Sequence, residues 1–291
     1  MTRIIDKLAD IATQYDTLYC DLWGCLHDGV EAFPEAVSAL TQFRSGGGRV
    51  VLMTNAPRPA PGVVRRLDDM GVPHEAYDLV VSSGDAAQAA MLQGAAGRRV
   101  HHIGPAKDDD FFTTLPEDMP DARPVERVAL AEAEGIVCTG PVEEDRDRPE
   151  DYRATLLHAK TRGLKLLCAN PDIVVDFGDR RVYCAGALAA LYDEMGGQSL
   201  YFGKPHPPIY DRARLKLAAR DAGDPGRVLA IGDGIATDIR GARLEDIDSL
   251  FISGGLAARE TGTARQPDPD KLAAFLQAAE ESPTFTMGFL R

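Results

Sequence analysis

Short apolar segments of strand length alternate with segments of helical pattern along most of this 291-residue chain. Strand-like runs occupy residues 17–22, 49–55, 77–84, 164–172, 200–205, 227–234 and 248–255. Several are followed by helical segments, such as the one from Pro34, which has proline at its start and glycines at its end. This alternation predicts right-handed βαβ units, and therefore an α/β fold built on a parallel sheet.

Polar side chains follow the apolar run in many of these predicted strands. They are Asp21, Thr54, Ser82 with Ser83, Lys204 and Asp233. At any one strand, such a residue can simply form a turn or cap a helix. Because open α/β sheets bind ligands at the carboxyl ends of their strands, the recurrence indicates a functional site at that edge.

Residues 84–183 have a different composition, with clusters of acidic residues and prolines. Strand-like "RRVHHIG", "EGIVCTG" and "LKLLCAN" alternate with helical spacers in this stretch. We interpret it as a small α/β domain inserted into a larger one. The predicted domains are therefore a core formed by residues 1–83 and 184–291, and an insertion formed by residues 84–183.

Charge and cysteine content restrict the partners and the compartment. The net charge of −13 disfavours nucleic acid and anionic membranes as partners. The five cysteines form no CxxC pair and no zinc-site spacing, and an odd count without a secretory segment indicates a reducing compartment. No apolar run approaches the roughly 18 residues of a membrane span, and residues 1–16 predict an amphipathic helix rather than a signal peptide. We therefore expect a cytoplasmic protein.

Four separated segments carry residues suited to phosphoryl chemistry. Asp21 and Asp233 follow strands and can hold Mg²⁺, with Asp238 close behind in the "GDGIATDIRGA" segment. A carboxylate beside a phosphoryl group can attack phosphorus and form an aspartyl phosphate. Lys204 and Thr54 can neutralise charge on the transferred group.

These segments resemble, in order, the four motifs of the haloacid-dehalogenase-like superfamily. "TNAPR", "CANPD", "GKPHPPIY" and "GDGIATDIRGA" are similar to its class IIA, the NagD and p-nitrophenyl-phosphatase group. The resemblance implies a Rossmann-like parallel-sheet core with a C2-type α/β cap domain inserted between the second and third motifs. It covers nearly the whole chain.

The resemblance also implies roles for individual residues. Asp21 would be the nucleophile and a metal ligand, Asp233 a second metal ligand and Asp238 a residue of the metal shell. Thr54 and Lys204 would hold phosphate. Further substrate or phosphate contacts are predicted for Asn55, Arg58, Asn170 and Asp172, with His206 as an additional candidate. Asn170 and Asp172 match an "NPD" element of the cap, for which an Asx turn is the alternative interpretation.

Trp23 departs from the family pattern. Phosphatases of the superfamily usually carry a second Asp two residues after the first, which protonates the leaving group. An indole N–H cannot replace it, although the backbone carbonyl of Trp23 can still bind the metal. Asp28 or His27 could substitute as the acid, with Asp28 taken as the catalytic candidate. Otherwise the substrate has a good leaving group, as in an acyl phosphate, an anhydride or an aryl phosphate.

The resulting hypothesis is a phosphatase that uses Mg²⁺ to cleave a small phosphomonoester through an aspartyl phosphate at Asp21. One alternative is a catalytically weak relative that binds a phosphorylated ligand or a partner. Another is a metal-independent dehalogenase, because those relatives also have an aromatic residue at the position of Trp23. The retained acids of "GDGIATD" disfavour it. The predicted partner is a small phosphorylated metabolite, and a homo-oligomer is compatible with the sequence.

Overall fold

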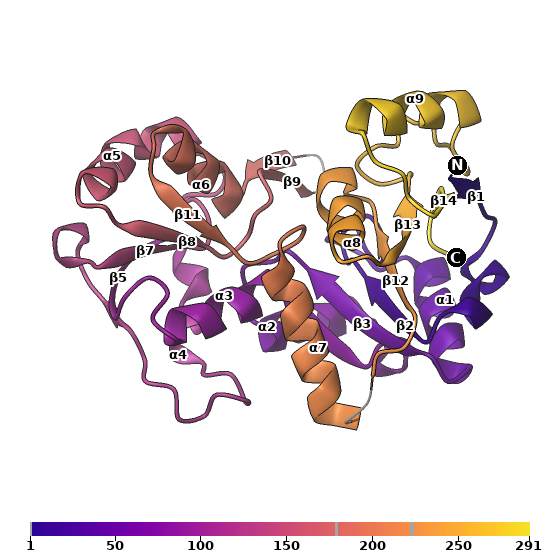
Figure 1. The fold of residues 1–291 in the computed structure, drawn as a ribbon, viewed down its shortest axis with the longest axis horizontal. Coiled ribbons are helices and arrows are strands. Elements are labelled where there is room, and N and C mark those ends of the chain that lie inside the picture. Colours follow the sequence, from indigo (N-terminus) through magenta and orange to yellow (C-terminus); the bar gives the residue numbers. More distant parts are fainter. Residues whose placement is uncertain (1, 178–179, 222–223) are drawn as a thin grey trace. The chain divides into compact units, whose positions relative to one another are not determined.

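The computed structural model describes residues 2–177, 180–221 and 224–291, and the chain divides into two compact units (Figure 1). The first unit comprises Met1–Thr54, Val64–Val81 and Tyr210–Arg291. The second comprises Asn55–Val63 and Ser82–Ile209. Each unit is built on its own largely parallel sheet, so the predicted α/β fold with a Rossmann-like core is confirmed.

The sheet of the first unit has the strand order β1-β14-β13-β12-β2-β3-β4. Its strands are β1 (Arg3–Ile4), β2 (Thr17–Cys20), β3 (Arg49–Thr54), β4 (Leu79–Ser82), β12 (Val228–Gly232), β13 (Asp248–Ile252) and β14 (Phe285–Met287). The pairings from β1 through to β3 are parallel. All four residues of β2 are buried, as expected for a central parallel strand covered on both faces.

Helices connect these strands. They are α1 (Pro34–Ser45), α2 (Ala60–Asp69), α7 (Pro207–Asp221), α8 (Arg240–Leu244) and α9 (Pro269–Ala279), with short helical turns η1 (Leu8–Asp10), η2 (Ala12–Gln14), η3 (His74–Ala76) and the π-helix η7 (Ile235–Ile239). Local signals define their ends: α1 begins with proline, and the Asp268 carboxylate caps the first turn of α9. None of the helices in the described part of the chain has the length and hydropathy that a membrane span requires.

The amphipathic helix predicted for residues 1–16 is wrong. This segment instead contributes β1, which pairs with β14, and the two short turns η1 and η2. The Asp10 carboxylate accepts hydrogen bonds from the backbone N–H groups of Asp6 and Lys7, which fixes the first turn. Leu8 and Ile11 are both buried and lie three residues apart. This spacing suits a 3₁₀ turn as well as the predicted α-helix.

The second unit has a parallel sheet in the order β11-β8-β7-β5-β6 and an antiparallel hairpin. The strands are β5 (Arg99–Ile103), β6 (Glu126–Arg127), β7 (Gly135–Cys138), β8 (Lys165–Cys168) and β11 (Gln198–Tyr201), with β9 (Val174–Phe177) and β10 (Arg180–Tyr183) in the hairpin. The helices are α3 (Ser83–Leu92), α4 (Asp110–Thr113), α5 (Arg153–Thr161) and α6 (Ala185–Glu194), with short turns η4 (Ala106–Asp108), η5 (Leu130–Glu132) and η6 (Pro149–Tyr152).

The second unit extends further along the chain than the insertion predicted to end at residue 183. It continues to Ile209, because β11 pairs in parallel with β8 and α6 packs into the hydrophobic core of this unit. Leu188 and Tyr192 of α6 are fully buried in that core. The strand expected at 200–205 therefore exists over Gln198–Tyr201, but it belongs to the second sheet rather than to the first.

Candidate active site

Two neighbouring strands of the first unit bring Asp21 and Asp233 to one edge of the sheet. β2 and β12 pair in parallel with Cys20 opposite Ile231, and the Asp21 N–H donates to the Ile231 carbonyl at 2.8 Å. Asp21 and Asp233 are 9% and 5% exposed. Together with the side chain of Cys25, their ligand atoms all lie within 4.8 Å of one another. Two buried carboxylates converging at the carboxyl end of a sheet are suited to a hard divalent cation.

Backbone contacts fix the carboxylate of Asp233. The Leu256 N–H donates to its Oδ2 at 2.9 Å. Gly24 and Gly255 both lie against the same oxygen: a Cβ added at either residue would be 2.1 or 2.0 Å from it. Gly24 has a φ of +69°, which glycine adopts at little cost. Glycine is therefore needed on two sides for Asp233 to occupy this position.

Asp238 lies in the π-helix η7 that follows Asp233 in the chain. Its buried carboxylate accepts a hydrogen bond from the Gly234 N–H at 3.1 Å. A Cβ at Gly232 would be 2.0 Å from the Asp238 carboxyl carbon, so this glycine permits the close approach. Asp238 is not part of the set formed by Asp21, Cys25 and Asp233. Its contacts indicate that it holds the turn carrying Asp233.

Thr54 ends β3, the other neighbour of β2. Cys20 pairs with Leu52, and β3 continues for two more residues to the buried Thr54. Parallel pairing therefore places Thr54 at the same edge of the sheet as Asp21. The prediction that residues following β2, β3 and β12 share one edge is confirmed for Asp21, Thr54 and Asp233.

The second unit brings together the remaining predicted motif residues. The Asn55 side chain accepts a hydrogen bond from the Lys204 N–H at 2.7 Å and donates to the Lys204 carbonyl at 3.0 Å and to Asp172 at 2.8 Å. Asn170 accepts from the Asp172 N–H at 2.9 Å, which is an Asx turn. Asn55 and Lys204 are buried. Asn55 thus fixes the backbone at Lys204, and Asn170 orients the segment that carries Asp172.

Arg58 faces a buried carboxylate that the sequence analysis did not single out. Arg58 Nε lies 3.7 Å from Asp108 Oδ1, and the Asp108 side chain is almost wholly buried. Burial raises the pKa of Asp108 above its ordinary value. No local pattern marks Asp108 among the neighbouring aspartates of "KDDD". His206 stacks on the ring of Tyr201 at 5.0 Å.

The loop after Asp21 packs around the ring of Trp23. His27 meets the indole edge-on at a centroid distance of 5.4 Å, and Gly29 lies against it, so that a Cβ there would be 2.1 Å from the indole Cη2. The Gly29 N–H donates to His27 Nδ1 at 3.0 Å. Burial lowers the pKa of His27 to about 4. His27 is therefore neutral near pH 7, with its proton on Nε2.

The Asp28 side chain forms hydrogen bonds with the backbone of the same loop. Its Oδ1 accepts hydrogen bonds from the N–H groups of Glu31, at 2.9 Å, and Val30, at 2.8 Å. These bonds lower the pKa of the exposed Asp28 carboxyl. A carboxylate stabilised in its charged form is a poor proton donor near pH 7. These contacts count against the predicted role of Asp28 as the general acid.

Cys25 is the member of the carboxylate set that the sequence analysis missed. It is 1% exposed, and burial followed by the charge of Asp233 raises its pKa well above the ordinary value. The side chain is therefore a neutral thiol near pH 7. A cysteine four residues after a candidate nucleophile gives no sequence signal of its own, because only the folded loop directs its sulfur toward both carboxylates.

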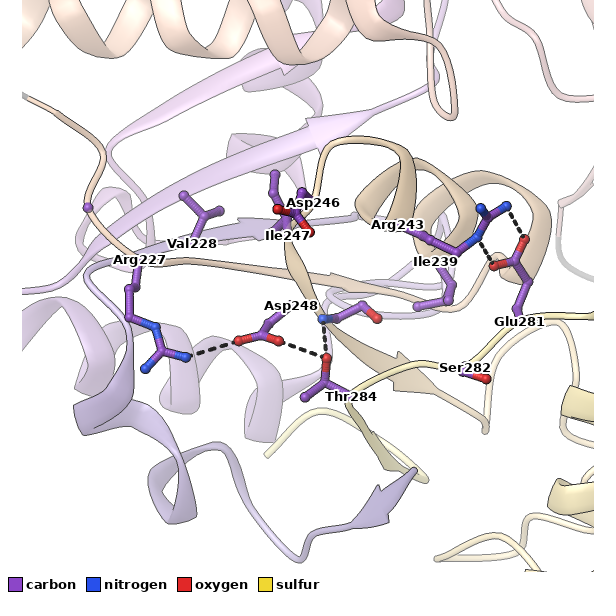
Figure 2. Close-up of a pocket in the computed structure, with 12 residues that line it drawn as sticks. Arg227, Val228, Ile239, Arg243, Asp246, Ile247, Asp248, Glu281, Ser282 and Thr284 are labelled. Carbon is purple, nitrogen blue, oxygen red and sulfur yellow. Dashed lines mark hydrogen bonds and ion pairs between the residues drawn. The ribbon is translucent and has the colours of Figure 1, made fainter. Parts of the chain in front are cut away.

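A cavity of about 490 Å³ lies elsewhere in the first unit (Figure 2). It is lined by residues at the amino-terminal ends of β12 and β13 and just before β14, so it lies at the edge opposite Asp21 and Asp233. Four of its charged side chains form two pairs: Arg227 with Asp248 at 3.1 Å, and Arg243 with Glu281 at 2.8 Å. These pairs join neighbouring segments of the fold and do not form a catalytic set.

Family comparisons agree with this geometry. Residues 18–115 match a family model described as haloacid dehalogenase-like hydrolase, and residues 201–279 match one described as HAD-hydrolase-like. The crystal structure of a haloacid dehalogenase-like family hydrolase from Brucella suis 1330 is 39% identical. It aligns over 99% of this chain and 100% of that chain, with a TM-score of 0.84.

Two relatives carry more specific descriptions. D-glycerol 3-phosphate phosphatase from Mycobacterium tuberculosis is 27% identical over 263 residues, which cover 86% of this chain and 66% of that protein's length. The structure of a glycerol phosphate phosphatase from the same organism, in complex with magnesium, is 24% identical with a TM-score of 0.65. That alignment covers 87% of this chain and 73% of that chain.

Proposed function

Because this chain belongs to the haloacid dehalogenase-like hydrolase family, we propose that it hydrolyses small phosphomonoesters in a Mg²⁺-dependent reaction, with Asp21 as the nucleophile. The observation that carries the proposal is the convergence of the buried Asp21 and Asp233 carboxylates at the carboxyl edge of the first sheet. The relatives described as a D-glycerol 3-phosphate phosphatase and as a glycerol phosphate phosphatase support the substrate class.

The donor set fits Mg²⁺. This ion binds oxygen ligands, often one or two carboxylates together with water and substrate phosphate. Asp21 and Asp233 would hold it, together with the backbone carbonyl of Trp23, and Asp238 would complete the surrounding shell. When bound, Mg²⁺ supplies positive charge that stabilises the phosphoryl group during transfer.

The residues of the chain account for the covalent chemistry. A carboxylate oxygen of Asp21 attacks phosphorus, and the bond from phosphorus to the ester oxygen breaks with its electron pair on that oxygen. Water then attacks the phosphorus of the aspartyl phosphate, which releases inorganic phosphate and restores the carboxylate. We assign phosphate binding to Thr54 and Lys204, and assign to Asn55 the fixing of the backbone at Lys204.

The proposed reaction lacks a good proton donor in the loop after Asp21. Trp23 occupies the usual position of the acid, His27 is neutral, and Asp28 is stabilised as a carboxylate. We therefore infer that, among phosphomonoesters, aryl esters are preferred over alkyl esters, because an aryl oxide departs without protonation. General acid catalysis is worth about 10²- to 10⁴-fold, so we expect aryl esters to exceed alkyl esters by a factor of this order.

Phosphate release from a panel of esters, with and without Mg²⁺, tests the proposal. We expect release that depends on Mg²⁺ and is lost in Asp21→Asn, but is retained in Asp69→Asn, which changes an exposed carboxylate on α2 in the same way. Absence of release from every ester by folded wild-type protein would refute phosphatase activity. Chloride release from a haloacid in the presence of chelator would instead support a dehalogenase.

A further inference from the structure

A buried thiol accompanies the two carboxylates of the proposed active site. The Cys25 sulfur and the oxygens of Asp21 and Asp233 lie within 4.8 Å of one another, and all three residues are buried. Within the described part of the chain, the Cys25 thiol makes no hydrogen bond. Its position beside two potential metal ligands is therefore not explained by a hydrogen-bonding role.

Other buried cysteines of the chain differ in this respect. The Cys20 thiol donates to the Asp21 carbonyl at 3.2 Å, and the Cys168 thiol donates to the Asn170 carbonyl at 3.2 Å. The Cys138 thiol approaches the Gly140 carbonyl at 4.0 Å. These are ordinary contacts of cysteines at the ends of buried strands. Cys25 instead directs its sulfur to the carboxylate pair.

The three side chains offer a mixed donor set of two oxygens and one sulfur. Mg²⁺ is a hard cation that binds oxygen ligands and does not take a thiol as a ligand. Zn²⁺, Cd²⁺ and Co²⁺ accept carboxylate and thiolate together, and Zn²⁺ commonly takes three protein ligands and leaves a fourth position open. The same carboxylates can therefore serve a hard ion through oxygen alone, or a thiophilic ion with sulfur as the third ligand.

We propose that Asp21, Cys25 and Asp233 form a binding site for a thiophilic divalent cation, represented by Zn²⁺, that competes with Mg²⁺. Binding of this ion displaces the thiol proton to solvent and forms a bond from the metal to the Cys25 sulfur. The ion occupies the Asp21 and Asp233 carboxylates in place of Mg²⁺, so it removes the cation on which phosphate release depends and inhibits the enzyme. This inhibitory consequence rests on the proposed phosphatase function, whereas the metal site itself does not.

Co²⁺ titration of the full chain, freed of metal by chelation and dialysis, tests the site by absorption spectroscopy. A cobalt–thiolate bond gives a charge-transfer band in the near ultraviolet, which carboxylate and water ligands do not produce. We expect this band in the wild-type protein, its displacement by Zn²⁺, and its absence in Cys25→Ser. The control is Cys138→Ser, which removes a fully buried thiol of the second unit and should retain the band.

Calorimetric titration supplies the affinities. Loss of an outer-shell partner of a metal site already lowers affinity about 10- to 100-fold, so loss of the sulfur ligand should weaken Zn²⁺ binding by at least about 100-fold. Mg²⁺ binding should persist in Cys25→Ser, which also shows that the variant is folded. Should Cys25→Ser misfold, Cys25→Ala provides the same comparison.

Two results would overturn the proposal: a near-ultraviolet band that survives in Cys25→Ser, or Co²⁺ binding to the wild-type protein without such a band. Neither result depends on turnover. If the wild-type protein shows the band but releases no phosphate, the metal site is supported and the proposed function is refuted. If it releases phosphate but shows no band, the proposed function is supported and the metal site is refuted.

Discussion

Gly255→Ala provides a sharp test of the Asp233 position. A Cβ at residue 255 would lie 2.0 Å from Asp233 Oδ2, whereas ordinary van der Waals contact requires about 3.5 Å. The backbone at Gly255 does not have a positive φ, so alanine is accepted there without backbone strain. Movement of the carboxylate is also restricted on a second side, because Gly24 lies against the same oxygen. The substitution therefore displaces the carboxylate by about 1–1.5 Å or forces the loop away from it.

A displacement of this size costs about 10²-fold in kcat/KM when it affects a group that positions the reaction. Overpacking of the buried contact should also lower the free energy of unfolding by about 1–3 kcal/mol. We expect weaker Mg²⁺ binding by calorimetry, slower phosphate release at saturating Mg²⁺, and a lower urea midpoint. The three measurements separate loss of the metal ligand from loss of the fold.

Gly140→Ala is the matched control. Gly140 also has no positive φ, and the nearest atom to an added Cβ is Pro105 Cδ at 3.9 Å, an ordinary contact. This variant should retain wild-type Mg²⁺ affinity. If Gly255→Ala also keeps wild-type Mg²⁺ affinity and kcat/KM, then the close approach to Asp233 does not fix a metal ligand and the reasoning is wrong.

Three further predictions follow from the contacts of single side chains. Asn55→Ala should raise KM and lower the free energy of unfolding by about 1–3 kcal/mol, measured by urea denaturation, because it removes both hydrogen bonds between the Asn55 side chain and the buried backbone of Lys204. Asp28→Asn should change alkyl-ester turnover by far less than the 10²- to 10⁴-fold that a lost general acid costs. The pKa of buried His27 is about 4 when folded and about 6.5 when unfolded, so its stabilising contribution is present above pH 6.5 and is lost as pH falls toward 4. Between about pH 7.5 and pH 5, the unfolding free energy of wild type should fall by about 2 kcal/mol more than that of His27→Gln.

The sequence was sufficient to predict the sheet edge that carries Asp21, Thr54 and Asp233. Each of these residues follows a run of buried apolar residues, and the convergence of parallel strands at their carboxyl ends is a general property of α/β sheets. The assignment of the strand at Gln198–Tyr201 was less successful. Its apolar pattern predicts a strand but not its sheet, because pairing with β8 depends on tertiary contacts of β11 and α6.

The loop after Asp21 shows where sequence reasoning fails at a site. Asp28 is close to the nucleophile in the chain, which made it a natural candidate for the acid, yet its carboxylate caps the N–H groups of Val30 and Glu31. Cys25 belongs to none of the motifs identified in the sequence, yet the turn through Gly24 places its sulfur beside both carboxylates. Chain distance does not determine side-chain direction in an irregular loop, so neither outcome could be predicted.

Trp23 and Cys25 have linked consequences for the proposed enzyme. Without a proton donor at position 23, stabilisation of the transition state depends more heavily on the charges around the phosphoryl group, which include the bound cation. A change in the identity of that cation should then have a larger effect on the rate than in a relative that retains the acid. Cys25 provides the donor that allows a thiophilic ion to compete for Asp21 and Asp233. The loop after Asp21 therefore lacks a general acid because of Trp23. Because of Cys25, the electrostatic stabilisation that remains depends on which metal ion is bound.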